Sequence, residues 1–163
     1  MCIRDSPINM AHLKDLAEFR KNIIAPVAGS EALGTALWYR DALALDAIDY
    51  MHYDLGWIGG ISEAIKISGI AHANNRMMCP HDCTGPIVWI ANLHISLAFS
   101  SSMILESVRS YYNGFYKKLV NNLPKIEKGF AFPMDGIGLG TELQDSLLKS
   151  PNTIIRRTSK NES

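Results

Sequence analysis

The sequence predicts an α/β fold in which about four strand–helix (βα) units follow one another, with an irregular tail after them. Short apolar runs alternate with segments of helix length over the first two thirds of the chain, and each apolar run ends at a polar residue. Strict alternation of strands with helices of about 10–15 residues is typical of parallel βαβ units with right-handed crossovers.

A surface helix is expected first, over residues 9–22, because apolar residues recur there at helical spacing among charged ones. Strands should follow where the apolar runs are nearly continuous, as in strands buried on both faces of a parallel sheet. These strands are expected at residues 23–28, 47–53, 77–79 and 103–105. Helices are expected between them, at residues 34–45, 60–74 and 86–99.

Length and charge exclude several classes of protein. The 163 residues suffice for one domain, but a closed eight-fold barrel typically needs about 250. Lys and Arg together number 16, as do Asp and Glu, so no nucleic-acid partner is expected. No apolar run reaches the ~18 residues of a membrane span, and no signal-peptide pattern opens the chain. We therefore expect a cytoplasmic protein without a membrane partner.

The chain divides into three parts by composition. Residues 1–6 show no periodicity and are interpreted as a non-native leader. Residues 7–110 carry the alternating pattern of the partial barrel. Residues 111–163 form the tail, in which repeated Pro and Gly predict irregular structure over residues 121–140.

Four predicted strands end in a side chain that can bind metal or transfer a proton: Glu31, Asp54, His81 and Glu106. Asp54 and His81 lie 27 residues apart, which is one strand-end to strand-end repeat of a βα unit. Because parallel barrel strands open at one face, these groups should share one mouth. A carboxylate can hold Mg²⁺, and a His oriented by an Asp can exchange a proton near neutral pH.

Several segments around these residues carry recognisable motifs, in chain order. They are Pro-Val-Ala-Gly-Ser-Glu-Ala-Leu at 26–33, Asp-Leu-Gly-Trp-Ile-Gly-Gly-Ile-Ser-Glu at 54–63, Pro-His-Asp-Cys-Thr-Gly-Pro at 80–86, Leu-Glu at 105–106, and Gly-Leu-Gly-Thr-Glu at 138–142. Together they resemble strands five to eight and the C-terminal box of the mandelate racemase/muconate lactonizing enzyme family of the enolase superfamily. The resemblance is greatest to its sugar-acid dehydratases, such as the galactonate dehydratases.

This resemblance implies the C-terminal half of a (β/α)8 TIM-type barrel, a sugar-acid substrate, and a homo-oligomeric full-length enzyme. The reaction removes the proton next to a carboxylate and eliminates the β-hydroxyl, which leaves a 2-keto-3-deoxy acid. His81 would be the base, or instead the acid for the leaving hydroxyl, and Asp54 would orient it. Glu106, if protonated, would hydrogen-bond the substrate carboxylate or the enediolate, and Glu31 would be one ligand of the Mg²⁺ cofactor.

The chain also departs from the family pattern. Two further metal ligands, a second base and the capping domain belong to parts of the family fold that precede the matching segments. We therefore expect the chain to be inactive alone. Racemisation, epimerisation or cycloisomerisation is the alternative within the superfamily. A non-catalytic half-barrel module that dimerises through its open sheet edges is the alternative outside it.

Each candidate also has a structural interpretation. Glu31 could cap the following helix, Asp54 could cap the Gly-Gly turn, and Glu106 could pair with Arg109. Three histidines fall inside predicted elements and are interpreted as packing or surface residues: His52, His72 and His94.

The segment from Cys79 through His81 to Cys83 could supply half of a structural zinc site. No second Cys or His pair completes it at a usual spacing, so we do not expect structural zinc.

Overall fold

The computed structural model describes residues 8–156, in two compact units that divide between Val108 and Arg109. The expected leader at residues 1–6 lies outside the described residues. Each unit is considered by itself. None of the helices in the described part of the chain is both long and apolar enough to cross a membrane.

The first unit is built on a parallel sheet of three short strands, β1 (Ala28–Gly29), β2 (Tyr50–Met51) and β3 (Met77–Met78), in that order. Both pairs are parallel. Within residues 8–156 this sheet does not close on itself. The prediction of an α/β partial barrel is therefore confirmed.

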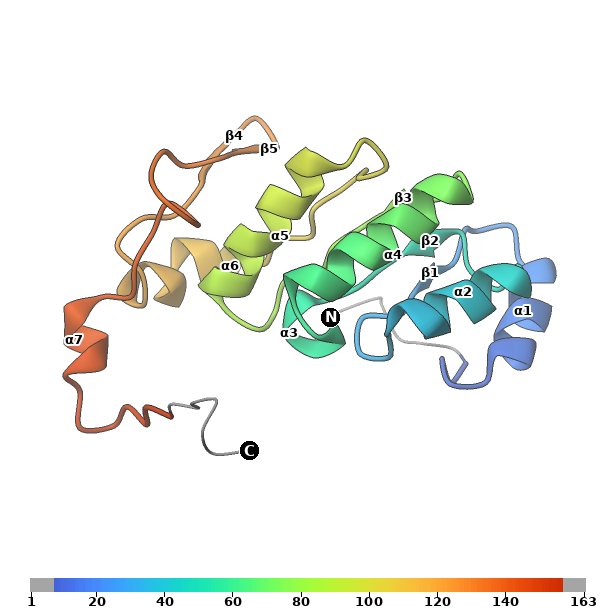
Figure 1. Cartoon of the computed structure of the whole chain (residues 1–163), viewed down its shortest axis with the longest axis horizontal. Coiled ribbons are helices and arrows are strands. Elements are labelled where there is room, and N and C mark those ends of the chain that lie inside the picture. Colours follow the sequence, from blue (N-terminus) through green and yellow to red (C-terminus); the bar gives the residue numbers. More distant parts are fainter. Residues whose placement is uncertain (1–7, 157–163) are drawn as a thin grey trace. The chain divides into compact units, whose positions relative to one another are not determined.

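Helices connect the strands and cover the sheet. They are α1 (Leu13–Lys21), α2 (Ala36–Ala44), α4 (Ile61–Ala73) and α5 (Pro86–Ala98), with a one-turn α3 (Leu55–Ile58) after β2. Figure 1 shows α2, α4 and α5 side by side across the strands. The core between them includes Tyr39 of α2, Ile67 of α4 and Trp89 of α5, all fully buried. Burial of each such side chain contributes about 1.5–3 kcal/mol before entropy is counted.

The first strand differs from its predicted position. Residues 23–28 were expected to be extended and buried, but β1 begins only at Ala28 and the Ile24 side chain is fully exposed. Pro26 explains the difference, because proline has no N–H for a sheet and restricts the residue before it. The ladder starts only after it, where the Val27 carbonyl accepts the Tyr50 N–H at 3.1 Å.

The predicted fourth strand at residues 103–105 is reduced to a single parallel bridge between Met78 and Ser102. The segment still runs alongside β3, since the Met103 N–H donates to the Met78 carbonyl and the Glu106 N–H donates to the Pro80 carbonyl, both at 2.9 Å. The prediction of a regular strand was wrong. The position of Glu106 beside the end of β3 follows from these two bonds.

The second unit contains α6 (Arg109–Asn113), the 3₁₀ turn η1 (Phe115–Lys118) and α7 (Asp145–Leu148). Residues 121–140 were expected to be irregular but contain an antiparallel hairpin, β4 (Lys125–Glu127) and β5 (Phe130–Phe132). Lys128 and Gly129 join the strands with φ of 51° and 84°. Positive φ at both turn residues matches the type I′ hairpin turn, a geometry that Gly favours.

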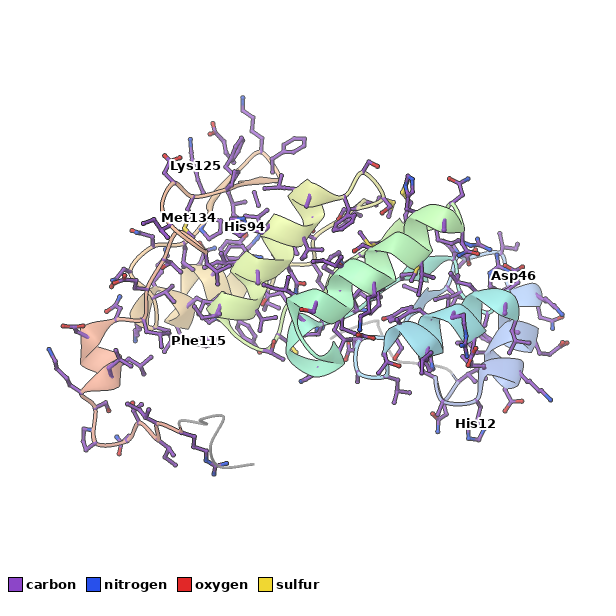
Figure 2. All side chains as sticks on the ribbon, viewed as in Figure 1. His12, Asp46, His94, Phe115, Lys125 and Met134 are labelled. Carbon is purple, nitrogen blue, oxygen red and sulfur yellow. The ribbon has the colours of Figure 1, made fainter. Side chains whose placement is uncertain are left out.

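The aromatic residues of the second unit pack on one another, with Tyr111 and Phe115 ring centroids 4.9 Å apart. Tyr116 is fully buried, whereas Phe115, labelled in Figure 2, is 45% exposed. The Gly-Leu-Gly-Thr-Glu box is held by the segment after η1, because the Thr141 hydroxyl donates to the Asn122 carbonyl at 2.9 Å.

One ionic contact fixes the entry to the first two strands. Asp49 accepts from the Arg20 guanidinium at 2.6 Å and from the Val27 N–H at 2.8 Å, so it ties α1 to the start of β1 and β2. The hydrogen bond from Arg20 lowers the pKa of Asp49; burial opposes it, and the Val27 N–H adds to it.

We expect Asp49→Asn to lower the free energy of unfolding at pH 7 by about 1.5–3 kcal/mol, as for hydrogen bonds to charged groups. Because the folded pKa lies below the unfolded one, this contribution is complete above the unfolded pKa and is lost as pH falls through the folded pKa. Urea unfolding at pH 7 and at pH 3 measures both effects.

The control for this prediction is Asp41→Asn, which removes a surface pair with Arg40 and should cost less than about 1 kcal/mol. Equal losses for the two variants at pH 7 would contradict the assignment of Asp49 as an anchor.

Candidate active site

The parallel sheet places the residues after its strands at one rim. The ladder continues beyond β2, where the His81 N–H donates to the Tyr53 carbonyl at 2.7 Å. This bond sets His81 beside Asp54, the next residue after Tyr53. The His81 side chain then contacts both Asp54 and Glu31.

The central contact joins Asp54 and His81. The Asp54 Oδ2 lies 2.9 Å from His81 Nδ1, and the carboxylate is fully buried. Its other oxygen, Oδ1, accepts the Gly56 N–H at 2.8 Å and the Thr84 hydroxyl at 2.9 Å. Asp54 is also the N-cap of α3. The carboxylate therefore caps α3, not the Gly59–Gly60 turn that follows it, and contacts His81 at the same time.

The protonation of Asp54 follows from these contacts. Burial acts to raise its pKa, but the hydrogen bonds from His81, Gly56 and Thr84 outweigh burial, and the pKa is lowered. Asp54 is accordingly ionised at neutral pH. A carboxylate facing Nδ1 favours a hydrogen on that nitrogen, which leaves the lone pair of the neutral ring on Nε2.

The other side of the His81 ring faces Glu31. Its Nε2 lies 3.2 Å from Glu31 Oε2, and the Trp57 ring lies over it with centroids 5.8 Å apart. The Asn92 amide donates to the His81 carbonyl at 2.8 Å from within α5. His81 itself is 3% exposed. The ring is thus held by Asp54 and Trp57 and the backbone by Asn92, with Nε2 directed at a partly exposed carboxylate.

Glu31 does not have the helix-capping role that was the alternative for it. The N-cap of α2 is Thr35, and the Ala36 N–H at the first turn donates to Glu63 Oε1 at 2.7 Å. Glu63 comes from α4, so the cap joins two neighbouring helices. Glu31 is directed at His81 instead.

Glu106 has an unexpected partner. Its Oε2 lies 2.8 Å from Nε2 of His52, whereas the sequence suggested Arg109 as the alternative partner. The His52 ring in turn contacts the His81 ring edge to face, with centroids 5.2 Å apart. Glu106 therefore joins the site through His52.

His52 was interpreted as a packing or surface residue. It is buried, and its ring both packs against His81 and pairs with Glu106. A strand directs alternate side chains to the same face, so His52 and Asp54, two residues apart, point to one side. The two-residue spacing of His52 and Asp54 could have predicted that they share a face, once the position of β2 in the sequence was known. His72 in α4 is exposed and His94 in α5 is partly exposed, outside this group.

The described side chains do not make a complete Mg²⁺ site. Mg²⁺ takes six ligands in octahedral geometry, usually one or two carboxylates with waters and substrate oxygens. Both Asp54 oxygens are occupied by hydrogen bonds, and Glu106 is paired with His52. Glu31 in turn faces His81 Nε2 at 3.2 Å, so these side chains by themselves do not supply the ligands that the ion requires.

A family model described as "Enolase C-terminal domain-like" matches residues 5–147. The chain belongs to this enolase C-terminal domain-like family. The resemblance found in the sequence motifs is thereby confirmed, together with the (β/α)-barrel type of the fold.

Two relatives of this chain are named as dehydratases. The chain is 29% identical to the arabinonate dehydratase of Saccharolobus solfataricus over 145 residues, which cover 89% of this chain and 38% of that one. It is 29% identical to the D-galactonate dehydratase of Verminephrobacter eiseniae, over 76% of this chain and 34% of that one. It therefore spans little more than a third of their length.

A solved structure also matches the fold of this chain. An enolase of the mandelate racemase subgroup from Agrobacterium tumefaciens is 38% identical, with a TM-score of 0.81. The match covers 88% of this chain and 38% of that one. The domain in hand is thus the C-terminal part of a fold shared with larger enzymes.

Asp54→Asn should lower the free energy of unfolding of this enolase C-terminal domain by about 1–3 kcal/mol, because the amide nitrogen cannot accept one of the three hydrogen bonds. Since the pKa of Asp54 is lowered by folding, the loss should be full above the unfolded pKa and shrink in acid. Chemical denaturation at pH 7 and pH 3 measures it.

Asp15→Asn is the matched control in the same unit, since Asp15 is exposed and pairs only loosely with His12 at 3.4 Å. It should change stability by no more than about 0.5 kcal/mol. If Asp54→Asn left the free energy of unfolding unchanged, the buried contacts of Asp54 would carry no net stabilisation.

Proposed function

We propose that this chain supplies the proton-transfer side of a sugar-acid dehydratase active site. The observation that supports this most is the His81 ring, fixed by a buried, ionised Asp54 at Nδ1 and facing the rim through Nε2. The relatives named arabinonate and galactonate dehydratase support the choice of an aldonate substrate.

In the proposed reaction, His81 Nε2 accepts the proton from the carbon next to the substrate carboxylate. The Asp54 carboxylate stabilises the imidazolium that results, because it stays paired with the Nδ1 hydrogen. The electrons of the broken C–H bond form the carbon–carbon double bond of an enol, and the β-hydroxyl takes the proton from the His81 imidazolium and leaves as water. The enol then tautomerises to a 2-keto-3-deoxy acid.

The other groups of the rim have supporting roles in this proposal. Glu31 contributes one Mg²⁺ ligand, and the remaining ligands come from barrel strands outside this chain. Bound Mg²⁺ would offset the negative charge that develops on the substrate carboxylate. Glu106, whose Oε2 pairs with His52 Nε2, would hydrogen-bond that carboxylate in its protonated form. Trp57, which is 46% exposed and lies over His81, offers an apolar face to the carbon chain of the substrate.

A chimera tests this function: residues 8–147 replace the matching segment of the Saccharolobus solfataricus arabinonate dehydratase. With Mg²⁺ and a panel of aldonates, the chimera should form 2-keto acid. His81→Asn should lower kcat by about 10²–10⁴-fold, the usual contribution of a general base. His72→Asn on the exposed side of α4 is the control and should retain the rate.

Two outcomes would count against this function. A chimera that dehydrates aldonates at the same rate with and without His81 would remove His81 from the mechanism. Exchange of the α-hydrogen in D₂O without loss of the hydroxyl would favour a racemase or epimerase instead. The 163-residue chain alone should form no 2-keto acid, because Glu31 is the one Mg²⁺ ligand that this proposal assigns to it and the other ligands would come from outside the chain.

A further inference from the structure

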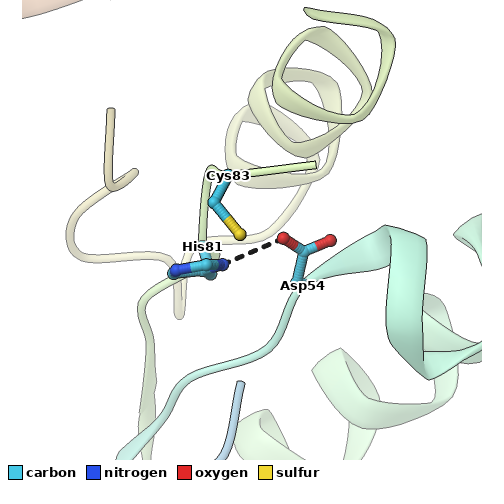
Figure 3. Close-up of side chains that lie close together, drawn as sticks. All are labelled: Asp54, His81 and Cys83. Carbon is cyan, nitrogen blue, oxygen red and sulfur yellow. Dashed lines mark hydrogen bonds and ion pairs between the residues drawn. The ribbon is translucent and has the colours of Figure 1, made fainter. Parts of the chain in front are cut away.

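A third side chain with metal-binding chemistry lies beside the Asp54–His81 pair. The Cys83 sulfur, a His81 ring nitrogen and an Asp54 oxygen all lie within 4.8 Å of one another. Figure 3 shows the sulfur directed toward the hydrogen bond between the other two side chains. Cys83 follows His81 by two residues in the loop before α5, and its side chain is exposed.

This set of donors suits a different class of ion from the Mg²⁺ of the proposed reaction. Mg²⁺ prefers oxygen ligands, whereas a thiolate, an imidazole and a carboxylate together suit Zn²⁺. Zinc sites with three protein ligands keep a fourth position for water. Cys79, the neighbouring cysteine, is not part of the cluster.

The distances among the ligand atoms of Asp54, His81 and Cys83 need only a small adjustment to fit a zinc ion. Tetrahedral zinc with bonds of about 2.0–2.3 Å places its ligand atoms roughly 3.3–3.6 Å apart. His81 Nδ1 and Asp54 Oδ2 are slightly closer, at 2.9 Å, and the sulfur is farther away. Rotation of the exposed Cys83 side chain can bring its sulfur in, while the two buried ligands stay near their positions.

We propose that Asp54, His81 and Cys83 form an inhibitory site for a borderline-soft divalent cation such as Zn²⁺. The inhibitory effect rests on the proposed function, because it requires His81 to be the proton acceptor. The cation binding itself does not depend on that function.

Inhibition follows from the two nitrogens of the ring. A cation on Nδ1 takes that lone pair, and the neutral ring then carries its hydrogen on Nε2. The Cys83 thiol releases its proton to solvent on binding. His81 Nε2 now has no lone pair to accept a substrate proton. Its hydrogen instead faces Glu31 Oε2 at 3.2 Å, the outer carboxylate partner that metal-bound His residues usually have.

Cobalt titration of the 163-residue chain tests the site, because Co²⁺ substitutes for Zn²⁺ and absorbs visibly. All forms carry Cys2→Ser. We expect one equivalent of Co²⁺ to bind with a thiolate-to-metal charge-transfer band, with displacement by Zn²⁺ and none by Mg²⁺. Cys83→Ser should abolish the band and weaken binding by more than about tenfold. Cys79→Ser is the matched control and should keep both.

A second measurement uses the chain with Cys79 and Cys83 intact. Zn²⁺ should slow iodoacetamide alkylation of Cys83 at least about tenfold, with a smaller effect on Cys79, as read by peptide mass spectrometry. Absence of the cobalt band at saturation, or equal protection of both cysteines, would overturn the proposal. Neither result depends on dehydration by the chimera. The cobalt and alkylation measurements therefore test cation binding, and the chimera separately tests the proposed function.

Discussion

The hydrogen bond between Asp54 and His81 is the interaction on which the site depends. It spans two neighbouring parallel strands, so it exists only while β2 and β3 keep their register. The backbone bond from the His81 N–H to the Tyr53 carbonyl sets that register at the rim. A slip of one residue would turn these side chains to the opposite face of the sheet. Fold and chemistry are therefore coupled through one strand pair.

The Asp54 carboxylate also stabilises the local backbone. Asp54 begins α3 by accepting the Gly56 N–H, and Thr84 ties it to the loop that carries His81. Gly56 suits this turn, because a Cβ there would lie 2.9 Å from the Thr84 hydroxyl oxygen. The approach of the two loops thus requires a residue without a side chain. One carboxylate, that of Asp54, therefore both caps α3 and contacts the His81 ring.

Among the residues that the structure describes, the rim carries three histidine–carboxylate contacts, made by two histidines. His81 lies between Asp54 and Glu31, and His52 pairs with Glu106. The two imidazole rings touch edge to face. A change at either pair should therefore be felt by the other ring, which is why the rim is best treated as one connected group.

Much of this organisation was predictable from the sequence. The helical segments at 60–74 and 86–99 were correct to within a residue or two of α4 and α5, because apolar periodicity and the Gly-Pro start of α5 are local signals. The Asp54–His81 interval predicted neighbouring strand ends. The hairpin of β4 and β5 was not predicted, because Lys128 is an unusual residue at a positive φ.

The sequence alone determined the class of fold, the family, and the residue types at the strand ends, since these follow from periodicity and motif spacing. Only the tertiary structure decided the partners. Glu106 pairs with His52 and not Arg109, Glu63 and not Glu31 caps α2, and Cys83 points at the Asp54–His81 bond. These contacts join residues from different elements, and such pairings depend on strand register and side-chain direction, which no local pattern encodes.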